Sequence, residues 1–262
     1  MPTFLGIGVQ RGGTTWIATC LREHPDVFLP QRKELRFFNF EYDKGIGHYQ
    51  SFFAEHLGQR AVGEITPSYY QNEPLKRIRQ HLPDGKLFIV LRNPIDRAFS
   101  QYQLNIAKNE ISAEDSFRDA CEKYDLIERG MYAKHLKRIR NVVPDEQLHV
   151  SFYDDLCDTP KQFIAEIYEF IGVDPSFEPP SLAKRYNRIV LEGTQRRLAQ
   201  MKLTWAVELV KRTPLGEWIK NRHTRSGPQI DSKDAAWLRE IFRDDVLELQ
   251  QMCDRDLCTW LT

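Results

Sequence analysis

The sequence predicts an α/β protein in which a parallel sheet is flanked by helices. Short apolar runs alternate with longer amphipathic segments along the chain, which is the pattern of βαβ units. A glycine-rich turn follows the first apolar run and precedes a helical segment. No internal repeat, low-complexity tract or Gly/Ser linker interrupts this order. We therefore expect a single domain over residues 1–262, with ligands at the carboxyl ends of its strands.

The individual elements follow from run length and flanking residues. Strands are expected at residues 3–9, 60–65, 86–92 and 146–153. Helices are expected at residues 14–25, from Pro94 onward, at 159–173 and at 231–252. The run KLFIVLR (86–92) is the strongest strand, because Asp84-Gly85 and Asn93-Pro94 flank it. The helix after it has proline in its first turn, where no backbone hydrogen bond is lost.

Composition argues against several classes of protein. Apolar residues make up 41% and charged residues 28% of the chain, as is ordinary for a soluble globular protein. Lys plus Arg and Asp plus Glu both number 37, and this zero net charge argues against a dedicated nucleic-acid binder. No apolar run approaches the roughly 20 residues of a membrane span, and no signal-peptide pattern opens the chain. The 5 cysteines are scattered and lack metal-ligand spacing. We expect reduced thiols, no metal site and a soluble, cytoplasmic protein.

The charge is locally uneven between Lys184 and Arg225. This segment holds eleven Lys and Arg but three Glu. Two interpretations remain open, namely a solvated helical face and a positive wall beside an anionic ligand.

The segment GVQRGGTTW (8–16) has the spacing of a phosphate-binding loop. Its glycines match the pattern G-x-x-x-x-G-K-[ST], but Thr14 takes the lysine position and Arg11 lies three residues earlier. Gly12 and Gly13 permit a tight turn and close approach of the backbone. The helix that follows favours an anion at its N-terminus. The alternative is a structural strand-to-helix turn that is rich in glycine.

A second motif, LRNPIDRAFSQY (91–102), follows the strongest strand. Arg92 leaves the sheet at its carboxyl end, and Ser100 lies on the next helix. A guanidinium and a hydroxyl in these places can clamp a phosphate from two sides. The alternative is that Arg92 pairs with a carboxylate and Ser100 is a solvated helix residue. A nucleoside-triphosphate enzyme is disfavoured, because it needs the loop lysine and an acidic residue at this strand end to hold magnesium.

Together, the two motifs resemble those of sulfotransferases that use 3′-phosphoadenosine 5′-phosphosulfate (PAPS). GVQRGGTTW resembles their 5′-phosphosulfate loop, and LRNPIDRAFSQY resembles their 3′-phosphate motif. The resemblance is greatest to the branch with the heparan sulfate sulfotransferase domains and its bacterial relatives. It extends to segments 30–39, 62–70, 128–136 and 222–231, and so to nearly the whole chain.

The resemblance implies a P-loop-type α/β fold and a metal-independent reaction. PAPS is the implied donor and adenosine 3′,5′-bisphosphate (PAP) the implied product. The sulfuryl group passes by in-line attack to a hydroxyl or amine of an acceptor, which is a carbohydrate or a small molecule.

The resemblance also implies a set of cofactor-binding residues. They are Arg11, Gly12, Gly13, Thr14, Thr15, Trp16, Arg92, Ser100, Tyr132, His223, Thr224, Arg225, Ser226 and Gly227. Tyr132 matches a position that helps to hold the adenosine end, although Tyr132 and Trp16 are also typical core aromatics. The segment 223–227 matches the cofactor loop of the family, and Arg225 is the residue that carries over best.

Arg11, Glu64 and Lys33 are the expected catalytic residues. The family often has Lys where this chain has Arg11, so we expect Arg11 to stabilise the leaving oxygen by charge alone. Glu64 matches an acidic position of the family and is expected to accept the proton of the acceptor. Lys33, beside Glu34, lies on a loop that the resemblance places over the active site. The alternatives are a structural hydrogen bond or salt bridge for Glu64 and a solvated charge for Lys33.

Two other functions remain open. A small-metabolite kinase of the P-loop class would need magnesium and Mg-ATP. A nucleotide-binding protein without catalysis would keep the fold and the phosphate loop. No nucleic-acid partner is expected.

Overall fold

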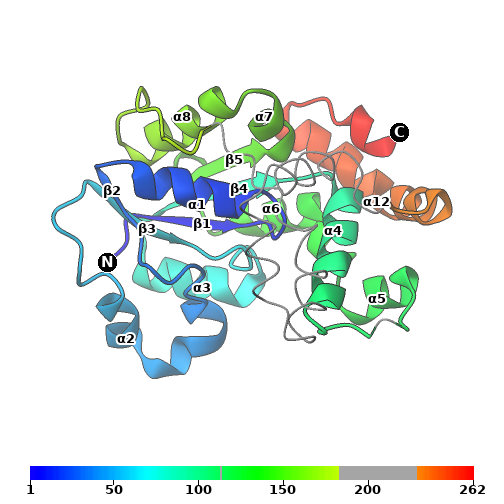
Figure 1. The fold of residues 1–262 in the computed structure, drawn as a ribbon, viewed down its shortest axis with the longest axis horizontal. Helices are drawn as coiled ribbons and strands as arrows, with labels where there is room; N and C mark the ends of the chain where they lie inside the picture. Colours follow the sequence, from blue (N-terminus) through cyan, green and yellow to red (C-terminus); the bar gives the residue numbers. More distant parts are fainter. Residues whose placement is uncertain (113, 183–228) are drawn as a thin grey trace, which may run out of the picture.

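The structure, a computed structural model, describes residues 1–112, 114–182 and 229–262 (Figure 1). Within this part of the chain lies a five-stranded sheet with the strand order β2-β3-β1-β4-β5, in which all neighbours are parallel. The strands are β1 (Phe4–Gly8), β2 (Val27–Phe28), β3 (Ala61–Ile65), β4 (Lys86–Leu91) and β5 (Leu148–Phe152). The predicted α/β fold with a parallel sheet is confirmed.

Helices cover both faces of the sheet (Figure 1). They are α1 (Thr14–Glu23), α2 (Ile46–Ser51), α3 (Asn72–His81), α4 (Pro94–Ala107), α5 (Phe117–Lys123), α6 (Tyr132–Arg140), α7 (Tyr153–Asp158), α8 (Pro160–Ile171) and α12 (Ser232–Cys253). Short helical turns are η1 (Phe37–Glu41), η2 (Tyr42–Lys44), η3 (Glu128–Gly130), η4 (Asp145–Gln147) and η5 (Cys258–Leu261). The core on one face involves α1 and α8, and the core on the other face involves α3, α4, α6 and α12.

Alternation along β4 explains why it is the strongest strand signal. Leu87, Ile89 and Leu91 join the core on the side of α3 and α4, whereas Phe88 and Val90 join the core on the side of α1 and α8. Because both faces of the strand are buried, its sequence is an unbroken apolar run.

Local signals set the helix ends. The Asn93 side chain accepts hydrogen bonds from the N–H groups of Ile95 and Asp96, at 3.0 and 3.4 Å, and so caps α4. Asp231 caps α12 by accepting from the Lys233 N–H at 2.8 Å. The predicted elements are confirmed with ends that shift by one or two residues. β2 was not predicted, because two residues are too short for a periodic pattern.

The order of the strands sets the position of the candidate site. β1 lies in the middle of the sheet, between β3 and β4. Parallel strands end at the same edge, so the segments that follow Gly8, Ile65 and Leu91 emerge side by side. These segments carry the motifs that the sequence singled out.

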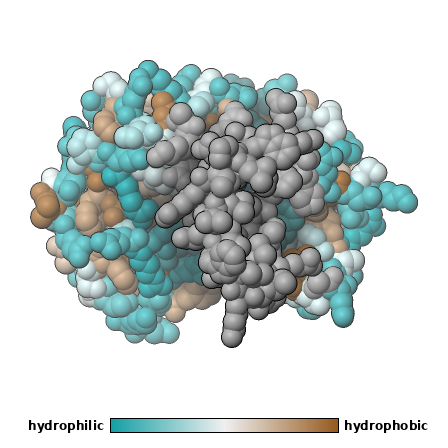
Figure 2. All heavy atoms as spheres, in the orientation of Figure 1, coloured by the Kyte–Doolittle hydropathy of each residue, from teal (hydrophilic) through white to brown (hydrophobic). Residues whose placement is uncertain are grey.

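The surface of the described residues is mainly hydrophilic on the face that Figure 2 shows. Phe40 and Leu57 are the large apolar side chains with the greatest exposure. No described helix combines the length and the apolar character that crossing a membrane requires.

Candidate functional site

The loop after β1 has a backbone that requires glycine at two positions. A Cβ on Gly12 would lie 2.8 Å from the carbonyl oxygen of Val90, and one on Gly13 would lie 2.8 Å from Leu156 Cδ1. Gly13 also has a φ of 80°, in the left-handed region. Helix α1 then begins at Thr14 without a side-chain cap, which leaves its first N–H groups for an anion. The loop therefore has the geometry of an anion cradle.

The two predicted phosphate motifs lie against each other. Arg11 Nε donates a hydrogen bond to Ser100 Oγ at 2.9 Å. Arg92 Nη1 donates to the carbonyl oxygen of Arg11 at 3.0 Å. The fold thus brings together three predicted site residues from the loop after β1, the segment after β4 and helix α4.

The charge of Arg92 has no anionic partner among the described residues. Within the part that the structure describes, Arg92 forms no ion pair, and its buried Nε has no hydrogen-bond partner. The residue as a whole is half-buried, and withdrawing a cation in part from water is costly unless an anion pairs with it. The arrangement therefore favours an anionic ligand over the alternative of a carboxylate partner, and the glycine cradle beside it fits a phosphate.

Tyr153 is a site residue that sequence reasoning missed. It opens α7 directly after β5, and its ring centroid lies 4.7 Å from Arg92 Cζ. The same ring lies 3.3 Å from the place that a Cβ on Gly13 would take. It therefore packs against both the loop and the guanidinium, and burial raises the pKa of its hydroxyl. Its place at the carboxyl end of a strand was the signal that the sequence offered.

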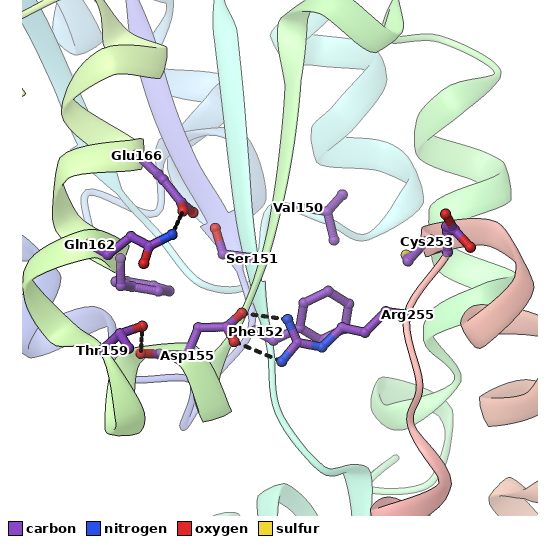
Figure 3. Close-up of a pocket in the computed structure, with 11 residues that line it drawn as sticks. Val150, Ser151, Phe152, Asp155, Thr159, Gln162, Glu166, Cys253 and Arg255 are labelled. Atoms are coloured by element: carbon purple, nitrogen blue, oxygen red, sulfur yellow. Dashed lines mark hydrogen bonds and ion pairs between the residues drawn. The ribbon is translucent and has the colours of Figure 1, made fainter.

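Figure 3 shows a cavity of about 480 Å³ that β5, α8 and the end of α12 enclose. None of the described residues among the predicted site residues lines it. Arg255 reaches from the segment after α12 to both carboxylate oxygens of Asp155 on α7, at 2.5 and 2.7 Å. Trp260 Nε1 donates to Asp154 Oδ2 at 3.1 Å. These contacts fasten α7, which carries Tyr153, to the C-terminal segment.

Tyr132 and Trp16 have packing roles. Tyr132 is fully buried, and its hydroxyl donates to the carbonyl oxygen of Arg92 at 2.8 Å. Trp16 is buried and donates from Nε1 to the carbonyl oxygen of Ser181 at 3.2 Å. These contacts fit the alternative of core aromatics, and the cofactor-binding role of both residues stays a prediction.

Glu64 is buried, with 2% of its surface exposed. Its Oε1 accepts hydrogen bonds from the hydroxyls of Tyr49 and Tyr69, at 2.9 and 3.0 Å. Its Oε2 accepts from the Thr66 hydroxyl at 2.8 Å and from the Leu35 N–H at 3.2 Å. Burial raises the pKa of Glu64 to about 6, against the lowering effect of these hydrogen bonds. Glu64 also lines a small pocket together with Lys33 and Glu34, and its predicted role as a base stays a prediction.

Lys33 does reach the phosphate loop. Its Nζ donates to Thr15 Oγ1 and to Glu34 Oε1, each at 3.0 Å. Glu34 also accepts from Arg36 at 2.9 Å, and its side chain is 25% exposed. Burial acts to raise the pKa of Glu34, but the hydrogen bond from Arg36 and the charge of Lys33 outweigh it and hold the pKa below its usual value. Glu34 is thus an ionised carboxylate, and Lys33 links it to Thr15 of the phosphate loop. Its sequence context did not indicate this arrangement.

The predicted cofactor-binding residues His223, Thr224, Arg225, Ser226 and Gly227 lie outside the described residues. The basic segment from Lys184 to Arg225 also lies outside them. Both stay predictions.

Comparison with known proteins supports one family. The model of the sulfotransferase domain matches residues 2–253. Human heparan sulfate glucosamine 3-O-sulfotransferase 3B1 is 27% identical over 98% of this chain, which spans 64% of that protein. Human heparan sulfate glucosamine 3-O-sulfotransferase 6 is 31% identical over 66% of this chain and 52% of that protein. The chain thus spans less than two thirds of the length of these relatives.

Solved structures agree with the observed fold. A sulfotransferase from Alicyclobacillus acidocaldarius matches 100% of this chain and 99% of its own, with a TM-score of 0.74 and 24% identity. Mouse sulfotransferase SULT7A1, solved in complex with PAP, matches 93% of this chain and 84% of its own, with a TM-score of 0.54 and 17% identity. The family model matches residues 2–253, which is nearly the whole chain. The chain therefore belongs to the sulfotransferase domain family.

Proposed function

We propose that this chain is a PAPS-dependent sulfotransferase that transfers a sulfuryl group to a hydroxyl or amine of an acceptor. The observation that carries the proposal is the cluster of Arg11, Ser100 and Arg92 beside the glycine cradle. Arg92, which forms no ion pair with any described residue, and the N-terminus of α1, which has no side-chain cap, supply two places for anionic groups. A PAP-bound relative with this fold supports the same ligand.

Different residues would bind the two charged groups of PAPS. The loop N–H groups, Arg11, Thr14 and Thr15 would hold the 5′-phosphosulfate. Arg92, supported by Tyr153, and Ser100 would hold the 3′-phosphate. Bound PAPS supplies the sulfuryl group to be transferred.

Charge at the loop is the main catalytic contribution of the protein. Arg11 and the loop N–H groups stabilise the negative charge that grows on the departing oxygen. Lys33, held at Thr15 Oγ1, adds a second cation at the same loop. Removal of one such donor typically costs roughly 100- to 1000-fold in rate.

Glu64 is the proposed base that accepts the proton of the acceptor. Burial raises its pKa to about 6, which is close to neutral pH, as suits a general base, and its side chain lines a small pocket with Lys33 and Glu34. Glu34 is the weaker candidate, because its contacts with Arg36 and Lys33 hold its pKa below the usual value.

The acceptor is proposed to be a carbohydrate or a small molecule. The names of the heparan sulfate relatives support a carbohydrate, while the fold itself does not select one. A cytoplasmic location is likewise a proposal, which rests on the sequence composition and is checked by cell fractionation.

The test is calorimetric titration of PAP, with EDTA present, into wild type, Arg92→Ala and Arg118→Ala. Arg118 is a matched control, because it pairs with Asp234 on the surface. We expect micromolar binding to wild type and to Arg118→Ala, and a loss of roughly 30-fold or more in Arg92→Ala, as for truncation beside a buried charge. A folded wild type that binds Mg-ATP but not PAP would indicate the kinase. Binding of neither nucleotide would also contradict the proposal.

A further inference from the structure

The segment that follows α12 packs against both helices that hold Arg92. Trp260, in the helical turn η5, is buried, with 3% of its surface exposed. Its ring centroid lies 6.3 Å from that of Tyr132, on α6, and 6.0 Å from that of Phe152, the last residue of β5. Its Nε1 donates a hydrogen bond to Asp154 Oδ2, on α7, at 3.1 Å. One side chain thus contacts the first turns of α6 and α7.

These two helices hold opposite ends of Arg92. The Tyr132 hydroxyl, from the first residue of α6, donates to the carbonyl oxygen of Arg92 at 2.8 Å. The Tyr153 ring, from the first residue of α7, lies 4.7 Å from Arg92 Cζ. The direction of the guanidinium therefore depends on where the two helices begin relative to the end of β4.

Helix α7 depends on outside contacts for its position. It has 6 residues and no side-chain cap, and a helix this short is not stable by itself. Two adjacent acids connect its first turn to the segment 254–262. Asp154 accepts the hydrogen bond from Trp260, and both carboxylate oxygens of Asp155 accept from Arg255. Because the Arg255–Asp155 pair is partly exposed, water screens it, and the buried Trp260 is the firmer anchor.

The turn that carries Trp260 is itself fixed to α12. The Leu257 N–H donates to Gln250 Oε1 at 2.9 Å, and the Trp260 N–H donates to the carbonyl oxygen of Leu257 at 2.9 Å. Leu257 is buried, with 2% of its surface exposed. The anchor therefore ties α7 to the longest described helix of the fold.

We infer that Trp260 is a positioning residue, which places Tyr132 and Tyr153 around Arg92 and so sets the direction of the guanidinium. Among the described residues, Trp260 makes its ring contacts and its side-chain hydrogen bond with these neighbours and not with Arg92 itself. The consequence for the 3′-phosphate rests on the proposed function, but the structural claim does not.

Amide hydrogen exchange, followed by NMR at Thr159, tests the structural claim without any ligand. The Thr159 N–H donates to the carbonyl oxygen of Asp155 at 2.8 Å and so reports on the opening of α7. We expect this amide to exchange at least about threefold faster in Trp260→Leu and in Asp154→Ala than in wild type. Asp154 is exposed, so Asp154→Ala should fold even if Trp260→Leu does not. Unchanged exchange in every folded variant of the two would overturn the inference.

Calorimetry with PAP and with adenosine 5′-phosphate, which lacks the 3′-phosphate, tests the consequence. In Trp260→Leu and Asp154→Ala we expect the Kd for PAP to rise by roughly 3- to 30-fold, the range for changes that act through neighbouring residues. The Kd for adenosine 5′-phosphate should stay within about twofold of wild type. Asp154→Asn, which keeps an acceptor oxygen, should restore most of the affinity for PAP.

Trp237 supplies a matched control on another part of α12. Its ring lies beside Arg118, at 5.1 Å from centroid to Cζ, so Trp237→Leu should leave both affinities and the exchange at Thr159 unchanged. Equal losses for the two nucleotides, or a loss in Trp237→Leu as large as in Trp260→Leu, would show general damage to the fold and overturn the inference. If wild type binds no PAP, the proposed function fails while the exchange data still decide whether Trp260 holds α7.

Discussion

Replacement of Tyr153 by leucine is expected to weaken PAP binding, because the Tyr153 ring packs on Arg92. The Tyr153 ring lies 4.7 Å from Arg92 Cζ and packs on the loop at Gly13. A partly desolvated contact between a cation and an aromatic face is worth about 1–2 kcal/mol. If this contact preorganises Arg92, its loss raises the Kd for PAP by roughly 5- to 30-fold. Tyr153→Phe keeps the ring and should stay within about twofold of wild type.

Calorimetry with PAP measures both variants, and Tyr42→Leu supplies a matched control. Tyr42 lies under Arg77, at 4.5 Å from ring centroid to Cζ, on another part of the fold. Its replacement removes a similar contact and should leave the Kd unchanged. Equal affinities for wild type and Tyr153→Leu, or equal losses in the leucine and phenylalanine variants, would refute the reasoning.

Three further predictions concern stability. Gly12→Ala places a Cβ 2.8 Å from a backbone oxygen of Val90, so we expect a loss of about 1–3 kcal/mol and a Tm lower by several degrees in calorimetry; an unchanged Tm would mean that the loop is not tight. The Arg255–Asp155 pair is partly exposed, with 31% and 39% of the side chains accessible, so a double-mutant cycle in urea should give a coupling of about 1 kcal/mol, and a value near zero would remove its role in fastening α7. Burial raises the pKa of Glu64 from 4.5 to about 6, so the folded state keeps a proton that the unfolded state releases between these pH values. Stability therefore falls as the pH rises through this window, and wild type should lose about 2 kcal/mol relative to Glu64→Gln between pH 4.5 and 7; parallel urea curves for the two proteins would contradict this.

The sheet was predictable because its central strands are buried on both faces. Runs such as 86–91 are apolar throughout, and a capping residue and a proline follow, so both ends of the strand and the start of the next helix are visible in the sequence. β2 has two residues, and pairing with β3 alone makes it a strand. No local pattern encodes that pairing.

The part of the site that two sequence motifs form was predictable, because each motif supplies its own backbone groups and charged side chains. Arg11, Arg92 and Ser100 meet as the motifs implied. The surroundings of Glu64 and Glu34 were not predictable, because they depend on which segments pack against each acid.

The contacts of Tyr153 and of Glu64 therefore required the fold. Tyr153 stacks on Arg92 because β5 lies beside β4, which is a fact of strand order. Glu64 is surrounded by hydroxyls from α2 and from the turn after β3, and only the packing of these elements reveals that all its lone pairs are used.

The most direct test of the central claim compares PAP with adenosine 5′-phosphate, which lacks the 3′-phosphate, on wild type and Arg92→Ala. If Arg92 and Ser100 hold the 3′-phosphate, wild type should prefer PAP by roughly 30- to 1000-fold, the range for a buried charged contact. Arg92→Ala should lose most of that preference while its affinity for adenosine 5′-phosphate stays near that of wild type. Equal affinity of wild type for the two nucleotides, or a preference for PAP that survives in Arg92→Ala, would contradict the account.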